Sequence, residues 1–216
     1  MNYFWTTGSL IGAGAATFVA SAAVLGCFNS ASADQTPMRF TKIDDMRPHV
    51  LPYDEANIIY GGTPVKATVR AVNRPGEVDF YFEAHDRVFD KELYSYDETT
   101  FRYRGNSDET YTPGIPLLRF PFDVGDSWTW AGTFNWGGRD RDAEAKISTA
   151  SERLNTLAGE FSTVVVTVEV EVESGGPEPA PYELKFWFVP EYGLVRREFA
   201  YGTTREPIAS SSVARQ

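Results

Sequence analysis

The sequence predicts an all-β protein: a curved, mostly antiparallel meander that forms a half-open, barrel-like sheet, preceded by one N-terminal apolar helix. From Ile58 onward, apolar and polar residues alternate with the two-residue period of half-buried strands. Clusters of Gly, Pro, Asn and Asp separate these runs and predict turns. By contrast, Leu10 to Leu25 contains no charged residue, which is typical of an export signal or a membrane-spanning helix.

The first segment, residues 1–27, ends in the order Val24-Leu25-Gly26-Cys27, which a lipoprotein signal peptidase accepts. In one interpretation, Cys27 is acylated and becomes the mature N-terminus. In a second, an ordinary signal peptidase cuts after Ala31-Ser32-Ala33. In a third, Tyr3 to Phe28 is retained as a transmembrane helix, because Met1 to Ser9 lacks the Lys or Arg of a usual signal peptide. We expect a membrane-anchored protein on the extracytoplasmic side, with these modes of anchoring left open.

Residues 28–57 are predicted to be a linker and an extended lead-in. Phe28 to Thr36 has the small, polar composition of a flexible spacer, and Arg39 to Asn57 contains Pro48 and Pro52, which predict irregular chain. Residues 58–206 suffice for one β-domain with its own core, and residues 207–216 are predicted to be a disordered tail.

Two runs within the β-domain show the clearest strand pattern. Val168 to Glu173 sets three valines on one face and three glutamates on the other, and Leu184, Phe186 and Phe188 share one face of a later run. About nine to eleven strands are expected, and such a meander must curl or close to protect its edges. The principal predicted strands are Val65–Ala71, Val78–Ala84, Leu93–Tyr96, Thr100–Arg104, Leu117–Phe120, Ser127–Trp136, Ala143–Ala150, Phe161–Glu173, Tyr182–Val189 and Leu194–Tyr201, with linkers at Asn106–Gly114, Asp123–Asp126 and Gly175–Pro181.

Four short motifs in the last part of the chain resemble those of a family of bacterial exported lipoproteins and periplasmic β-domains of unknown function. They are Gly125-Asp126-Ser127-Trp128, Ala158-Gly159-Glu160-Phe161, Trp187-Phe188-Val189-Pro190 and Gly193-Leu194-Val195-Arg196, in the pattern G-D-x-W, A-G-x-F, an aromatic pair and G-L-V-R. The resemblance implies a curved antiparallel sheet with a concave face. It supplies no reaction, and its motif residues are those of turns and strand starts.

Composition excludes several classes of partner. The net charge is −10, and every charged residue lies at or beyond Asp34. Nucleic acids and anionic lipid surfaces reward clustered Lys and Arg, so neither is expected as a partner. The chain has one cysteine, so no intramolecular disulfide is possible, and its 15 Phe, 11 Tyr and 5 Trp must hold the fold by burial.

An aromatic row is the candidate ligand or partner surface. Trp128, Trp130, Phe134 and Trp136 fall on one strand face, and Gly132 leaves a gap among them. On a concave sheet such a row could stack on sugar rings or receive an acyl chain or a tetrapyrrole. The simpler interpretation is a hydrophobic core, because large aromatic residues inside a β-domain need no special cause.

No other constellation supports chemistry. Asp140, Asp142 and Glu144 share a face and could contribute to a calcium site, but arginines alternate with them, so we assign no metal residues. His49 and His85 have no catalytic neighbours in the sequence, and no nucleophile elbow or phosphate-binding loop is present in it.

The basic residues, Arg197 among them, are expected on solvated faces, and Arg102 and Arg104 share a face, so they could pair across to a neighbour such as Glu169 or Glu171. We therefore expect no catalytic residues and no cofactor. The expected function is a non-catalytic, membrane-tethered extracytoplasmic domain, an accessory or scaffold subunit that docks on a membrane protein complex. The alternative is a periplasmic lipoprotein that binds an apolar or glycan-like ligand on a concave, aromatic-lined sheet.

Overall fold

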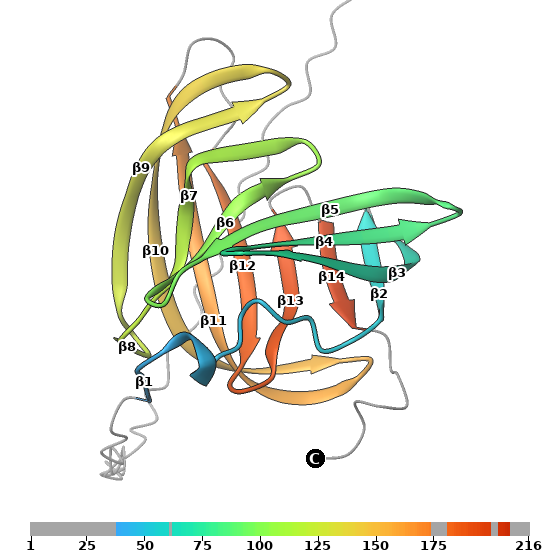
Figure 1. The fold of residues 1–216 in the computed structure, drawn as a ribbon, viewed down its shortest axis with the longest axis horizontal. Coiled ribbons are helices and arrows are strands. Elements are labelled where there is room, and N and C mark those ends of the chain that lie inside the picture. The colour runs from blue at the N-terminus through green and yellow to red at the C-terminus, as the bar shows by residue number, and fades with distance from the viewer. Residues whose placement is uncertain (1–37, 61, 174–180, 200–202, 208–216) are drawn as a thin grey trace, which may run out of the picture. The chain divides into compact units, whose positions relative to one another are not determined.

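The computed structural model describes residues 38–60, 62–173, 181–199 and 203–207 (Figure 1). Several of the sequence predictions lie outside these residues: the N-terminal apolar helix, Cys27 with its anchor, the spacer from Phe28 to Thr36, most of the linker Gly175–Pro181, and the tail beyond Pro207. Among the described residues, no helix is both long enough and apolar enough to cross a membrane.

Twelve strands form a closed barrel in the order β10-β11-β12-β13-β14-β2-β3-β4-β5-β6-β7-β9, and every neighbouring pair is antiparallel. The all-β, antiparallel prediction is confirmed, but the sheet is closed and not half-open. Closure comes from the pairing of β14 with β2 and of β7 with β9. The elements are β1 Arg39–Phe40, η1 Ile43–Asp45, β2 Glu55–Tyr60, β3 Thr63–Arg74, β4 Glu77–Ala84, β5 Arg87–Tyr96, β6 Thr100–Asn106, β7 Glu109–Arg119, β8 Phe122–Asp123, β9 Ser127–Trp136, β10 Arg139–Thr156, β11 Gly159–Val172, β12 Tyr182–Val189, β13 Gly193–Phe199 and β14 Thr203–Pro207.

Several boundaries differ from the prediction, for local reasons. The expected linker Asn106–Gly114 shrinks to a turn at Ser107 and Asp108, because Asn106 Oδ1 accepts hydrogen bonds from the backbone N–H groups of Asp108 and Glu109 at 2.8 and 3.0 Å. The lead-in contains β1, η1 and the start of β2. Pro207, expected in the tail, is the last residue of β14 and is buried.

Turns between successive antiparallel strands alternate from one end of the barrel to the other, so each end has its own set of turns. The two ends also differ in what covers them. We call one the lead-in end, because residues 38–54 run across it and bury Phe40, Met46 and Tyr53 there. The Leu194 N–H donates to Val50 O at 3.1 Å, and a Cβ on Gly193 would lie 2.3 Å from that oxygen, so this contact requires glycine. We call the opposite end, with the turns at residues 85–86, 107–108 and 137–138, the distal end; its hairpin tips spread apart, with the β9–β10 tip at the top of Figure 1 and the β4–β5 tip at the right.

The interior is filled mainly by aromatic and branched side chains. The inward valines of β11, Val168 and Val170, are fully buried, and Leu184, Phe186 and Phe188 of β12 are buried as predicted. Ring contacts link neighbouring strands, such as Tyr94 of β5 on Phe101 of β6 at 5.0 Å, and also cross the barrel, such as Tyr103 of β6 on Phe186 of β12 at 5.3 Å. A smaller apolar cluster, formed by Leu154, Val165, Trp187 and Val195, lies apart from this main core. Burial of aromatic rings therefore stabilises a fold that has no intramolecular disulfide.

Candidate functional site

Four charged residues meet inside the barrel and form what we call the ion cluster: Asp90 and Glu92 of β5, Arg197 of β13 and Arg205 of β14. Arg205 donates two hydrogen bonds to Glu92, from Nε at 2.6 Å and from Nη2 at 3.2 Å. Arg197 reaches Glu92 at 3.1 Å and Asp90 at 3.1 Å, and the Tyr94 hydroxyl donates to Glu92 at 2.6 Å. Glu92 is 0% exposed and both arginines are 1% exposed, so the cluster is inside the protein.

Strand alternation places these charges inside. Phe199 faces the core, and Arg197, two residues earlier on the same strand, therefore faces the core as well. Tyr94 is also buried in the core, so Glu92, two residues before it, lies on the same inward face. Arg205 lies directly opposite Arg197 in the β13–β14 register. Like charges directly opposite each other repel, so the two arginines need the carboxylates of β5 between them.

Burial sets the electrostatics of the cluster. It raises the pKa of Glu92 to about 7, an effect that Arg197 and the Tyr94 hydroxyl oppose. It lowers the pKa of Arg205 to about 9. Burial also works to lower the pKa of Arg197, but Glu92 and Asp90 outweigh it and the pKa lies above its ordinary value. Among the described residues, Arg205 Nη1 and Arg197 Nε have no hydrogen-bond partner.

A third carboxyl, Glu109, lies toward the distal end of the interior and is 8% exposed. Its Oε1 accepts long hydrogen bonds from the Tyr103 hydroxyl at 3.5 Å and from Asn106 Nδ2 at 3.4 Å. Burial raises its pKa to about 7, while Tyr111, Arg197 and Tyr103 act in the opposite direction. The Tyr111 and Tyr182 hydroxyls are hydrogen-bonded to each other nearby.

These groups do not form a recognisable catalytic site. The two described hollows, with volumes of about 730 and 290 Å³, are lined by other residues. Within the same residues, no group of three or more His, Cys, Asp or Glu side chains is placed to hold a metal ion. In some proteins, paired buried charges of this kind help to specify the fold.

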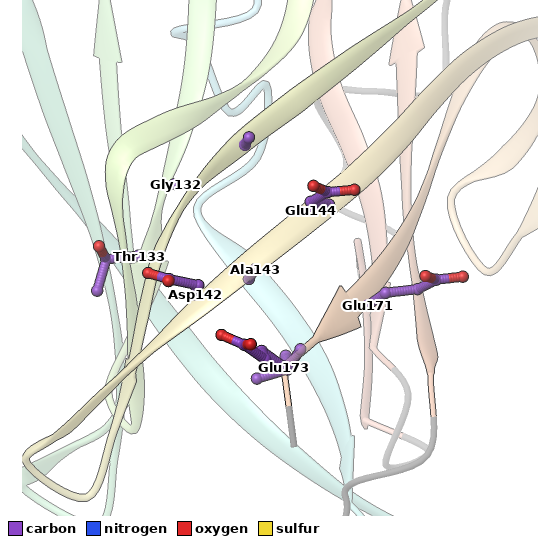
Figure 2. Close-up of a pocket in the computed structure, with 9 residues that line it drawn as sticks. Gly132, Thr133, Asp142, Ala143, Glu144, Glu171 and Glu173 are labelled. Carbon is purple, nitrogen blue, oxygen red and sulfur yellow. The ribbon is translucent and has the colours of Figure 1, made fainter. Parts of the chain in front are cut away.

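The larger hollow, about 730 Å³, lies over β9, β10 and β11 near the distal end (Figure 2). Its lining includes Asp142, Glu144, Glu171 and Glu173 around Gly132. Glu144 and Glu171 are directly opposite across the β10–β11 ladder, which makes the patch strongly acidic. Asp140, grouped with Asp142 and Glu144 from the sequence, instead accepts a hydrogen bond from Asn135 Nδ2 at 2.6 Å.

The aromatic row is mostly packed. Trp130 and Phe134 are buried, and Trp128 is half-buried against the core. The Trp128 indole donates to Pro116 O at 2.6 Å and the Trp130 indole to Pro113 O at 3.0 Å, both on β7. The row is therefore not an open platform, and only Trp136, at 52% exposure, faces solvent.

The gap expected at Gly132 is filled. A Cβ there would lie 2.5 Å from Trp130 Cζ2 and 2.6 Å from Thr112 O, so the ring and the β7 backbone already occupy the space. Gly132 serves a close approach of two strands and does not leave room for a ligand.

The predictions for the charged residues need correction. Arg102 pairs with Asp97 at 2.8 Å and Arg104 pairs with Glu77, not with β11 glutamates, because β6 lies between β5 and β7. Arg197 was expected on a solvated face and is buried. His49 is half-buried and stacks on Tyr96 at 5.0 Å, while His85 lies in the β4–β5 turn with φ of 53°.

The sequence reasoning missed the ion cluster, although a signal existed. Glu92, Arg197 and Arg205 each occupy a core-facing position of a strand, and a charge at such a position is rarely buried unless it is paired. Opposite charges on separate core-facing positions therefore predict a pair, but only the closed barrel shows which strands face each other.

Large apolar side chains are exposed at hairpin tips of the distal end. Val88 and Phe89 follow the β4–β5 turn, and Trp136 precedes the β9–β10 turn. Trp136 is directly opposite Glu109 at the start of β7, so the tips of the β6–β7 and β9–β10 hairpins are neighbours. At the lead-in end, Met38 and Leu157 are exposed, Leu157 at 62%.

Comparison with known proteins gives low-identity structural likenesses only. The hypothetical lipoprotein YmcC from Escherichia coli is 13% identical with a TM-score of 0.43, over 72% of this chain and 85% of that one. A candidate exported protein with a YmcC-like fold from Bacteroides fragilis is 16% identical, with a TM-score of 0.39, over 73% and 94%. A candidate lipoprotein from Parabacteroides distasonis is 12% identical, with a TM-score of 0.37, over 74% and 94%. No family model and no curated protein sequence matches the chain.

Proposed function

We propose that the chain is a non-catalytic, membrane-tethered extracytoplasmic domain that docks on a membrane protein complex as an accessory subunit. The observation that carries this proposal is the difference between the two ends of the barrel. The chain enters at the lead-in end, while Trp136, Val88 and Phe89 are exposed at the opposite end. A domain held by its lead-in end presents these apolar tips away from the attachment point, where a partner can cover them.

The described interior supports docking over enclosure of a ligand. Three members of the aromatic row contact the protein's own strands, and the inward faces are filled by rings. A docked partner would contact Trp136, because tryptophan is among the residues that contribute most to interfaces.

Site-specific photo-crosslinking in native membranes tests the docking surface. A photoreactive side chain replaces Trp136 in one variant and Leu157 in a matched control, since both positions are more than half exposed but lie at opposite ends. We expect position 136 to give one discrete adduct with a membrane protein and position 157 to give none. Equal labelling from both positions, or no adduct from either, would contradict docking through the distal end.

Fatty-acid labelling, with a Cys27→Ser variant as its control, tests the tether separately. If Cys27 carries the acyl anchor, the wild type is labelled and the variant is not; if the apolar tract is retained as a helix without acylation, neither protein is labelled. An intact mass of the wild-type protein distinguishes a start at acylated Cys27 from a start at Met1. A wild-type protein recovered wholly outside the membrane fraction would contradict both forms of tether.

A further inference from the structure

The β7–β9 ladder closes the barrel along only a small part of the two strands. β7 has 11 residues and β9 has 10, but the register pairs four: Glu109 to Thr112 with Thr133 to Trp136. Beyond Thr112 the strands are bridged by the indole hydrogen bonds of Trp128 and Trp130 to proline carbonyls. The prolines contribute no N–H of their own, so a longer ladder is not available there.

Glu109 is the terminal residue of this short ladder and points into the protein. It lies directly opposite Trp136, whose side chain is half exposed at the distal end. Its hydrogen-bonding neighbours are neutral: Tyr103 and Asn106 donate long bonds at 3.5 and 3.4 Å, and the Tyr111 hydroxyl also interacts with it, but no ion pair to Glu109 is present among the described residues. A charge on Glu109 would therefore be buried without a bonded cation, which is costly.

The groups around Glu109 offset only part of the cost of such a charge, since burial still outweighs them. Asp108 in the adjoining turn is itself acidic and raises the pKa of Glu109, and Arg197 across the barrel acts on it but is already bonded to Asp90 and Glu92. The other groups that face it are neutral: Tyr103 and Asn106 of β6, Tyr111 of its own strand, and the Trp136 side of β9.

We propose that the four-pair β7–β9 ladder is a pH-sensitive latch, in which loss of the Glu109 proton opens the seam between β7 and β9 at the distal end. Below pH 7 the carboxyl is protonated and remains inside, because burial raises its pKa from 4.5 to about 7. When the seam opens, water reaches the carboxylate and its pKa falls toward 4.5, so rising pH favours the open form. Opening would also release Trp136, Tyr111 and Phe134 from their present contacts.

Hydrogen exchange of the detergent-solubilised full chain tests the latch. Protection factors, corrected for intrinsic exchange, are measured at pH 5 and pH 8 for ladder amides and for β11–β12 amides. We expect ladder protection to fall roughly 50- to 100-fold between the two pH values in the wild type. Glu109→Gln is the matched control, because it keeps the side-chain shape but cannot ionise, and its ladder protection should not change with pH.

Two results would overturn the latch: an equal fall in Glu109→Gln, or a uniform fall over β11 and β12 as well as the ladder. The second would indicate that the whole barrel, including the ion cluster around Glu92, loses stability together. If Glu109→Gln does not fold, carbon NMR of the wild-type Glu109 carboxyl replaces it. Titration near 4.5, or Thr112 and Thr133 amides that do not follow the carboxyl, would equally refute the latch. It does not depend on the docking role, since neither measurement involves a partner.

Discussion

Gly132→Ala tests whether the seam depends on close approach of β7 and β9. In an unconstrained strand, replacing glycine by alanine stabilises a protein by about 0.5–1 kcal/mol, because glycine loses more backbone entropy on folding. At Gly132 the new methyl group would lie 2.6 Å from Thr112 O and 3.1 Å from Pro113 Cδ, as well as 2.5 Å from Trp130 Cζ2. An ordinary contact is near 3.5–4 Å, so backbone as well as side chain must move.

The two effects oppose each other, and the structure decides the sign. Overpacking costs about 1–3 kcal/mol, more than the entropic gain, so we expect Gly132→Ala to lower the free energy of unfolding by about 1–2 kcal/mol. Urea unfolding followed by tryptophan fluorescence and by far-UV circular dichroism measures this change. Ala131→Ser, at the exposed neighbouring position, should stay within about 0.5 kcal/mol of wild type.

The double variant Gly132→Ala with Trp130→Phe identifies which contact is responsible. Phenylalanine removes the carbon atom nearest to the new methyl group but leaves Thr112 O in place. We therefore expect most of the cost of Gly132→Ala to persist in the Trp130→Phe background. A Gly132→Ala protein more stable than wild type would refute the close-approach reasoning altogether.

Three further predictions concern charges and hydrogen bonds. Between pH 4.5 and pH 8 the free energy of unfolding should decrease by about 3 kcal/mol less in Glu109→Gln than in the wild type, as denaturation across this range measures, because the folded-state pKa of Glu109 is raised from 4.5 to about 7; the decrease that remains in the variant is assigned to Glu92, whose pKa is also raised to about 7. Arg205→Met should lower the free energy of unfolding by about 3 kcal/mol, because it removes a buried partner of Glu92. Arg153→Met, in an exposed ion pair, should lower it by under about 1 kcal/mol, and equal losses of the two variants in urea unfolding would contradict this prediction. Trp130→Phe should cost about 1–2 kcal/mol through the lost bond to Pro113 O, and the exposed Trp136→Phe under about 0.5 kcal/mol, as thermal melts can compare.

Local pattern was enough to predict most strands, because each depends on residues close in sequence. The alternation of Val168 to Glu173 and the core face of Leu184, Phe186 and Phe188 are seen in the structure as expected. Closure of the barrel was not predictable in this way. It depends on β14 meeting β2 across more than 140 positions of the chain, and no local signal in Thr203 to Pro207 specifies that partner.

The aromatic row illustrates the same limit for the candidate site. Spacing on one strand face placed Trp128, Trp130 and Phe134 correctly toward the interior, but could not show what lies opposite. The structure places β7 there, with Pro113 and Pro116 offering carbonyls that no backbone donor of β9 satisfies in a ladder. An apparent platform is therefore a seam between strands.

The ion cluster gives the closure of the barrel a definite register. β14 is five residues long, and a short strand between two others is weakly specified by its own backbone pairing. A slip of one residue would turn Arg205 outward and break its two hydrogen bonds to Glu92. Glu92 would then be left inside with Arg197 alone, and a buried carboxylate with fewer partners is strongly disfavoured. The charges thus disfavour the wrong pairing of β14 more than they stabilise the right one, which explains why a barrel core holds two arginines.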